Sequence, residues 1–478
     1  MGGSLARMVS MLMFIAGCSP TPTLTPSTAP TGTAIPSATA TVTVTGALDW
    51  SGPVRLPLEL LGGNVRGLAS DGRHLVAIGG LFGILDVSLQ PAIWRSDDGL
   101  AWVRVSIPVG FEDAILSAVT AGGPGFVIVG SIGKQAQPNQ PAPAIRAAVW
   151  TSVDGGTWEP VVADTAFADA RMADVAVGSV GLVAVGFSQT PAGQPFGSSC
   201  LDALAWTSSD GVSWSRSPAS ASLACSTSTS ITAAGAGYVA IGSYYETDAN
   251  GIVSTRPATW SSSDGRAWLA TKEHDLTGVS RLHDVAAGPG GLVAIGETEE
   301  GDLGVWRSAA GQSWARVSSD AFASPSGGGF QPRGVILGWD GGFVASVAGG
   351  DNTSSRSYVW ASKDGATWVR SSAAALAATW PISGLAIHGD RLVAVGGQGY
   401  NLGAWVSPPA GAAPEPAPGL PVTVEKPIEI APDARAFDVV AGDGLLLALG
   451  RSGDSTAWLS SRSRLTRRST RTRTARWK

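Results

Sequence analysis

Short apolar runs recur along the chain, and nearly all of them end in glycine. Each run has five residues, taken mainly from Val, Ile, Leu and Ala, as in Leu-Val-Ala-Ile-Gly. Seven runs end in glycine and an eighth ends in valine: Gly79, Gly130, Gly186, Gly242, Gly296, Gly396, Gly450 and Val347. Continuous apolar runs of this length predict strands buried on both faces, because a half-exposed strand would alternate apolar and polar positions.

A pair of tryptophans eight residues apart follows six of these runs. Between the two tryptophans lies the pattern Ser-x-Asp-Gly in five copies, as in Trp94-Arg-Ser-Asp-Asp-Gly-Leu-Ala-Trp102, and a degraded form with Ala309-Ala310-Gly311 in the copy at Trp306. The other copies begin at Trp150, Trp206, Trp260, Trp306 and Trp360. Asp-Gly between two segments that favour strands predicts a hairpin turn, because glycine accepts a positive φ and aspartate caps its own turn.

These patterns define a repeat of roughly 53 residues between Trp50 and Trp458. Each unit predicts four short strands and no helix, which is the content of a β-propeller blade. We therefore predict an all-β propeller over residues 47–460, most simply of eight blades, with the N-terminal strand around Trp50 closing the last blade. Seven blades are the alternative, if one weak unit, such as that around Trp405, is irregular.

The first 46 residues predict an export signal and a linker. Arg7 precedes the apolar run Met8–Ile15, and small residues lead to Cys18, so that residues 1–17 read as a signal peptide. Ile-Ala-Gly-Cys resembles the bacterial lipobox, which implies that Cys18 is lipidated; the alternative is an ordinary signal beside a chance cysteine. The uncharged Thr- and Pro-rich residues 18–46 predict an extended linker. We expect a lipoprotein of the bacterial cell envelope, anchored in the lipid bilayer and facing outside the cytoplasm.

The C-terminal residues 461–478 differ in charge from the rest of the chain. They contain eight of the 32 basic residues and no acidic residue, whereas the whole chain has a formal net charge of −5. Such a segment predicts a disordered tail, which would either contact anionic lipid or be a frame-shifted end without a role. Without it the net charge is about −13, so the folded part lacks the basic stripe that nucleic acid requires. Four His and three Cys without paired spacing predict no metal site and no cofactor.

The Ser-x-Asp-Gly turn resembles the Asp box, or BNR repeat, of bacterial sialidases and of several propellers that are not enzymes. It is one residue shorter than the family pattern, so the turn must differ in detail. The resemblance implies that the turn carboxylates are structural and lie on the face away from any active site. These residues are Asp98, Asp154, Asp210, Asp264 and Asp364.

Three arginines occupy one position in the repeat, and a group of polar and aromatic residues follows the fourth apolar run. Arg171, Arg281 and Arg435 each stand 15 residues before the glycine of their unit, where they would either hold an anion near the central channel or pair with carboxylates at its rim. Tyr244, Tyr245 and Glu246 are expected in a loop between the second and third strands. In propellers these loops lie opposite the hairpin turns, so this loop face is where we expect a ligand.

The cysteines and the candidate residues together limit the function. Once Cys18 is lipidated, Cys200 and Cys225 remain in an exported chain and are expected to form a disulfide. No residues form a convincing nucleophile, base and acid, so no catalytic residue is assigned. We expect a monomeric binding or scaffold module for a glycan or a protein, and the alternative is a glycoside hydrolase of the sialidase type.

Overall fold

The computed structural model describes twelve segments of the first compact unit, two single residues and three strands of a second unit. They are residues 51–56, 63–82, 89–111, 113–134, 144–189, 200–247, 253–272, 276, 278–318, 322, 330–351, 354–371, 381–399, 401–407, 435–442, 445–452 and 455–462. The first unit spans residues 1–413 and the second spans 414–478. The signal peptide, linker, Cys18 and tail that the sequence predicts lie outside the described residues, apart from Ser461 and Arg462 in the last strand.

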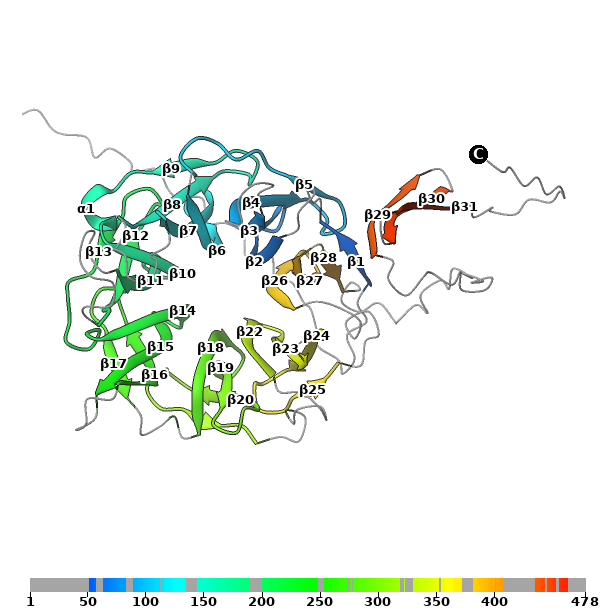
Figure 1. The fold of residues 1–478 in the computed structure, drawn as a ribbon. Coiled ribbons are helices and arrows are strands. Elements are labelled where there is room, and N and C mark those ends of the chain that lie inside the picture. The colour runs from blue at the N-terminus through cyan, green and yellow to red at the C-terminus, as the bar shows by residue number, and fades with distance from the viewer. Residues whose placement is uncertain are drawn as a thin grey trace, which may run out of the picture. The chain divides into compact units, whose positions relative to one another are not determined.

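The first unit is a ring of seven four-stranded blades (Figure 1). Blades 1 to 3 contain β2 (Gly63–Ser70), β3 (Leu75–Phe82), β4 (Leu89–Ser96) and β5 (Trp102–Arg104); β6 (Ala114–Gly122), β7 (Gly125–Ile132), β8 (Arg146–Ser152) and β9 (Glu159–Val161); and β10 (Ala170–Gly178), β11 (Gly181–Ser188), β12 (Ala203–Ser208) and β13 (Ser215–Arg216). Blades 4 to 6 contain β14 (Ser226–Ala234), β15 (Gly237–Thr247), β16 (Val253–Ser262) and β17 (Leu269–Lys272); β18 (Val279–Gly288), β19 (Gly291–Thr298), β20 (Leu303–Ser308) and β21 (Ala315–Arg316); and β22 (Phe330–Trp339), β23 (Gly342–Asp351), β24 (Ser354–Ser362) and β25 (Val369–Arg370). The first strands of neighbouring blades contact one another and close the ring.

The N-terminal strand closes the ring, as the sequence predicts. Blade 7 consists of β26 (Ile382–His388), β27 (Arg391–Gly399), β28 (Asn401–Val406) and β1 (Ser51–Arg55), with β1 antiparallel to β28. The favoured count of eight blades is corrected to seven, the alternative count, because the unit around Trp405 captures the N-terminal strand. The outer strand of this unit, β28, is therefore paired with β1 and not with a strand of the eighth sequence unit.

The eighth unit forms a three-stranded sheet of its own within the second compact unit. Its strands are β29 (Arg435–Gly442), β30 (Leu445–Ser452) and β31 (Ser455–Arg462), paired in that order. A fourth strand is not among the strands described for this unit. The repeat pattern thus continues along the chain past the seven blades of the first unit.

The seven apolar runs of the ring are second strands buried on both faces, as predicted. A tryptophan in the third strand of each ring blade packs beside them and is 0 to 1% exposed: Trp94, Trp150, Trp206, Trp260, Trp306, Trp360 and Trp405. Each core cluster combines residues of two adjacent blades; one, for example, joins Val183 of blade 3 to Tyr238 and Trp260 of blade 4. A single blade therefore buries its faces only against its neighbours.

The glycine at the end of each apolar run allows a close approach between the first two strands. The first strand is bulged opposite this glycine, as between Leu116 and Ala118 in blade 2. A Cβ atom on Gly130 would lie 2.0 Å from the backbone oxygen of Ile115. The same contact, at 2.0 to 2.2 Å, recurs at Gly79, Gly186, Gly242, Gly296 and Gly396. In blade 6 the pair is reversed, because Gly334 of the first strand lies opposite Val347.

The Ser-x-Asp-Gly turns are held by their own side chains. In blade 3 the Ser208 hydroxyl accepts the N–H of Gly211, and Asp210 Oδ1 accepts the N–H groups of Val212 and Ser213 at 2.8 and 2.7 Å. The second tryptophan, Trp214, donates its indole N–H to the Gly211 oxygen. The glycine has φ of +80°, which explains its identity. The eight-residue spacing of the tryptophans therefore corresponds to a hairpin whose turn is stabilised by hydrogen bonds from its own side chains.

Helix is nearly absent from the described part of the chain. Its α-helix is α1 (Asp164–Phe167), a single turn between blades 2 and 3. Among the described residues, no helix is long and apolar enough to cross a membrane.

Candidate functional site

Two carboxylates and a hydroxyl link the first strands of blades 3 to 6 near the centre of the ring. Asp174 accepts the N–H of Val175 in its own strand and the N–H of Ile231 in blade 4, both at 2.8 to 2.9 Å. Asp284, two blades further round the ring, makes the same contacts with Val285 of its own strand and with the N–H of Ile336 in blade 6. Ser230 of blade 4 donates its hydroxyl to Asp284 Oδ1 at 2.7 Å. These contacts join four consecutive blades.

The surroundings of the two carboxylates favour their protonated form. Burial, reinforced by the negative charge of Asp284, raises the pKa of Asp174 to about 7. Burial also raises the pKa of Asp284 to about 6. His283 has the opposite response, since burial and the charge of Arg281 lower its pKa to about 4. Neither ring nitrogen of His283 has a hydrogen-bond partner among the described residues.

We expect Asp174→Asn to change how stability depends on pH. Because the folded-state pKa of Asp174 is raised, its contribution is fully present below the unfolded value near 4 and is lost as pH rises through about 7. Asparagine does not ionise, so the difference in melting temperature between wild type and variant should shrink from pH 5 to pH 8. Thermal unfolding measured at both pH values tests this expectation.

Asp364→Asn is the matched control for this comparison. The N–H of Thr367 lowers the pKa of Asp364, which is therefore ionised throughout this range. The difference in melting temperature between Asp364→Asn and wild type should be the same at pH 5 and pH 8. If the difference in melting temperature between Asp174→Asn and wild type were also the same at pH 5 and pH 8, the expectation would be wrong.

The arginines of the predicted cluster are placed at equivalent strand positions. Arg171 lies on β10 and Arg281 on β18, near the strand ends at the loop face, and the backbone oxygen of each faces the glycine of its blade. Neither side chain forms a hydrogen bond or an ion pair with any residue that the structure describes. Arg171 is half-buried, and this burial lowers its pKa. Arg435 begins β29 of the second unit, so its strand is described but not its side chain.

Tyr244, Tyr245 and Glu246 lie in a strand rather than in the predicted loop. β15 extends to Thr247 and pairs with β16 along its whole length, because both segments carry residues that favour strands. Tyr244 packs against the core between blades 3 and 4, and Glu246 forms an ion pair with Arg256 at 3.3 Å. Tyr245 is half-buried, and its N–H bonds to the backbone oxygen of Cys225.

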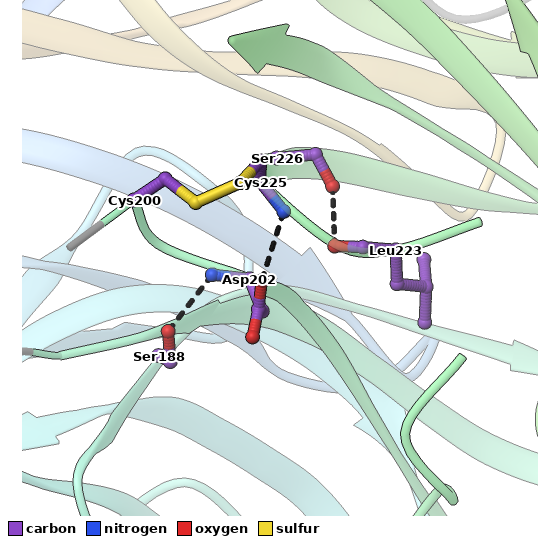
Figure 2. The surroundings of a disulfide bond; sticks show 6 residues. All are labelled: Ser188, Cys200, Asp202, Leu223, Cys225 and Ser226. Carbon is purple, nitrogen blue, oxygen red and sulfur yellow. Dashed lines mark hydrogen bonds between the residues drawn. A yellow bond between two sulfur atoms is a disulfide. The ribbon is translucent and has the colours of Figure 1, made fainter. Parts of the chain in front are cut away.

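A disulfide between Cys200 and Cys225 joins blade 3 to the start of blade 4 (Figure 2). The two Cα atoms are 5.0 Å apart. Beside the disulfide, Asp202 accepts the N–H of Cys225 at 2.8 Å and donates its own N–H to the Ser188 hydroxyl. Ser188 directly follows Phe187, the strand partner of Arg171. We call this connected surface the blade 3–4 rim: Arg171, Phe187, Ser188, Cys200, Asp202, Cys225 and Tyr244–Glu246.

The five turn carboxylates have the geometry expected of structural groups. Each accepts backbone N–H groups of its own turn. The five turns lie on the face of the ring opposite the blade 3–4 rim. The N–H of Ser213 lowers the pKa of Asp210 to about 2. They are Asp98, Asp154, Asp210, Asp264 and Asp364.

Sequence reasoning did not identify the inter-blade contacts of Asp174 and Asp284. Each stands three residues after an arginine of the predicted cluster, Arg171 or Arg281, so a signal was present in their shared position. Ser230 carried no such signal, because it stands in a Ser- and Thr-rich strand without a distinctive pattern.

Comparisons with known proteins find only distant similarities to solved structures. No protein-family model and no curated protein matches it. An acylaminoacyl peptidase of Pyrococcus horikoshii aligns at 11% identity and a TM-score of 0.45, over 81% of this chain and 57% of the peptidase. A Trypanosoma rangeli sialidase in complex with the inhibitor DANA aligns at 14% identity and a TM-score of 0.38, over 64% of this chain and 56% of the sialidase. The β-propeller domain of the Trilobed protease from Pyrococcus furiosus aligns at 9% identity and a TM-score of 0.40, over 75% of this chain and 98% of that domain.

All three similarities are distant, with TM-scores of 0.38 to 0.45. The chain spans just over half the length of the peptidase and of the sialidase. Their activities therefore carry no argument for this chain, and its function must be inferred from its own residues.

Proposed function

We propose that the protein is a binding module that holds an acidic glycan or an acidic segment of a protein at the blade 3–4 rim. Lipidation at Cys18 and the linker at residues 18–46 would anchor it to the membrane outside the cytoplasm and extend the ring away from the bilayer. The short hairpins belong, in this proposal, to the Asp-box group of propellers.

The observation that carries the proposal is that the Arg171 guanidinium has no hydrogen-bond or ion-pair partner among the residues that the structure describes. A half-buried cation is costly unless an opposite charge accompanies it. No described carboxylate pairs with Arg171, while both oxygens of nearby Asp174 accept backbone N–H groups. A carboxylate, sulfate or phosphate group of a ligand would supply the missing charge through two parallel hydrogen bonds.

The remainder of the blade 3–4 rim suits a ligand with both apolar and polar groups. Phe187 and Tyr245 are half-buried aromatic residues on neighbouring blades, and aromatic rings provide apolar contact area to sugars and peptides. The disulfide and the Asp202 hydrogen bonds hold in place the strands that carry Phe187 and Tyr245. A prearranged surface of this kind loses little entropy when a ligand binds.

No specific observation favours the hydrolase alternative. Sialidase chemistry, as the resemblance implies it, requires a tyrosine paired with a glutamate and an aspartic acid beside three arginines. Glu246 instead forms an ion pair with Arg256, and the carboxylates of Asp174 and Asp284 are bonded to backbone groups of two blades. We therefore propose binding without catalysis.

Arg171→Ala tests the proposed function. On an array of glycans and peptides, the wild-type chain should bind members that carry carboxylate, sulfate or phosphate groups. The variant should bind the same members at least about tenfold more weakly, because a charge-assisted bidentate contact contributes about 1.5 to 3 kcal/mol. Tyr245→Ala should weaken binding by a smaller factor.

Arg266→Ala is the matched control, since Arg266 is an exposed arginine of a Ser-x-Asp-Gly turn on the opposite face. It should bind as wild type does. Equal losses for Arg171→Ala and Arg266→Ala would show that total charge rather than the blade 3–4 rim is responsible. Binding of neutral array members alone would also contradict the proposal.

A further inference from the structure

A cleft opens between blades 4 and 5 on the turn face, which carries the Ser-x-Asp-Gly turns. Its volume is about 620 Å³, within the range of pockets that hold small molecules. Blade 4 contributes the turn Ala234–Gly237 and the segment Ser261–Ser263, and blade 5 contributes Ala309, Ala310 and Gln312. The cleft thus lies at the opposite end of the blades from the blade 3–4 rim.

Short side chains face each other at this junction between blades. In blades 1 and 5, the residue after the first tryptophan is an arginine that reaches the turn of the next blade. Arg95 donates to the backbone oxygen of Asp154, and Arg307 lies 3.4 Å from the position of a Cβ on Gly365. Ser261 has the same register position in blade 4, opposite Val239, but its side chain is too short to cross the junction.

The turn of blade 5 has also lost its carboxylate. Ala310 replaces the aspartate of the other five turns. The turn keeps its remaining bonds, because the Ser308 hydroxyl accepts the N–H of Gly311 and Trp314 donates to the Gly311 oxygen. The change therefore removes bulk and charge from the wall of the cleft without unfolding the hairpin.

The chemistry of the lining excludes charged groups. It contains no Asp, Glu, Lys, Arg or His. Ser261, Ser263 and Gln312 offer hydroxyl and amide groups that form no hydrogen bond with other described residues. Leu269, at one side of the cleft, is 60% exposed. Such a lining combines groups that both donate and accept hydrogen bonds with small apolar walls.

We infer that this cleft is a second binding site, for a neutral saccharide. A sugar ring offers several hydroxyls to Ser261, Ser263 and Gln312 and an apolar C–H face to Leu269. An acidic ligand would lose hydration without gaining an opposite charge, so the site discriminates against it. The inference is independent of the acidic ligand proposed for the blade 3–4 rim.

Ser261→Arg tests the site with a side chain that the fold already accepts at this position in two other blades. Binding of neutral disaccharides of glucose, galactose, mannose and N-acetylglucosamine is followed by saturation-transfer NMR and by titration calorimetry, with N-acetylneuraminic acid as the charged comparison. Wild type should bind at least one neutral disaccharide saturably and should not bind the acid in this cleft. Ser261→Arg should weaken that binding by about tenfold or more, because the arginine fills the cleft.

Thr207→Arg is the matched control, because Thr207 has the same register position in blade 3, opposite Val183. It should bind the disaccharide as wild type does. If Ser261→Arg fails to fold, Gln312→Ala should still weaken binding about threefold, since it removes one amide contact from an exposed position. Absence of neutral-sugar binding, an equal effect of both arginine variants, or preference for a peptide in the cleft would overturn the inference. Arg171→Ala should leave this binding unchanged, so the two sites succeed or fail separately.

Discussion

Gly130→Ala should destabilise the propeller by about 3 kcal/mol or more, among the largest effects of any single methyl group in this chain. The added Cβ would lie 2.0 Å from the backbone oxygen of Ile115 and 3.1 Å from its carbonyl carbon. Rotamer changes cannot relieve a clash with backbone, so β6 and β7 must separate and lose part of their ladder. Urea unfolding followed by tryptophan fluorescence measures the loss.

Gly67→Ala is the matched control in the first strand of blade 1. Its added Cβ would lie 3.4 Å from Ile78 and 3.5 Å from Val119, which is ordinary contact. The control should unfold close to wild type. Similar stabilities of the two variants would refute the explanation that the recurrent glycine serves the close approach of two strands.

Deletion of residues 51–56 should open the ring and cost about 3 kcal/mol or more, from the loss of one buried leucine and several ladder hydrogen bonds. β1 pairs with β28, and Leu56 beyond it is 2% exposed and donates its N–H to Leu402. Without this segment, blade 7 has three strands and its outer edge is unpaired. The midpoint of urea unfolding should fall, and limited proteolysis should cut first within blade 7.

Removal of residues 414–478 provides the comparison. These residues form a compact unit of their own, so the midpoint of the ring should be unchanged. If this truncation lowered the midpoint as much as the deletion of β1, the eighth sequence unit would be part of the ring, and the count of seven would be wrong.

The sequence determined the features that recur in each repeat and depend on residues close together in the chain. The apolar run before Gly130 predicted a doubly buried strand, because its pattern has no polar face. The pair Trp206 and Trp214 predicted a hairpin, because the Ser208 and Asp210 side chains bond within the same few residues. Four strands per repeat then predicted a propeller, since a blade buries its faces only against other blades.

The candidate sites required the tertiary structure. Strand propensity did not show that β15 extends through Tyr244 and Tyr245, since the strength of that hairpin depends on pairing with β16. That Arg171 forms no ion pair with a described residue could not be read from spacing, because ion-pair partners can lie on other blades. The cleft beside Ser261 results from two small residues on different blades that meet across a junction.

Tertiary structure also decided the number of blades. Eight units carry the apolar run, and nothing local distinguishes the run before Gly396 from that before Gly450. Closure depends on which outer edge captures β1 and on whether successive blades complete a full turn, and both are properties of the assembled ring. Short-range patterns therefore specified the blade, whereas contacts between residues as distant as Val54 and Ala404 specified the ring.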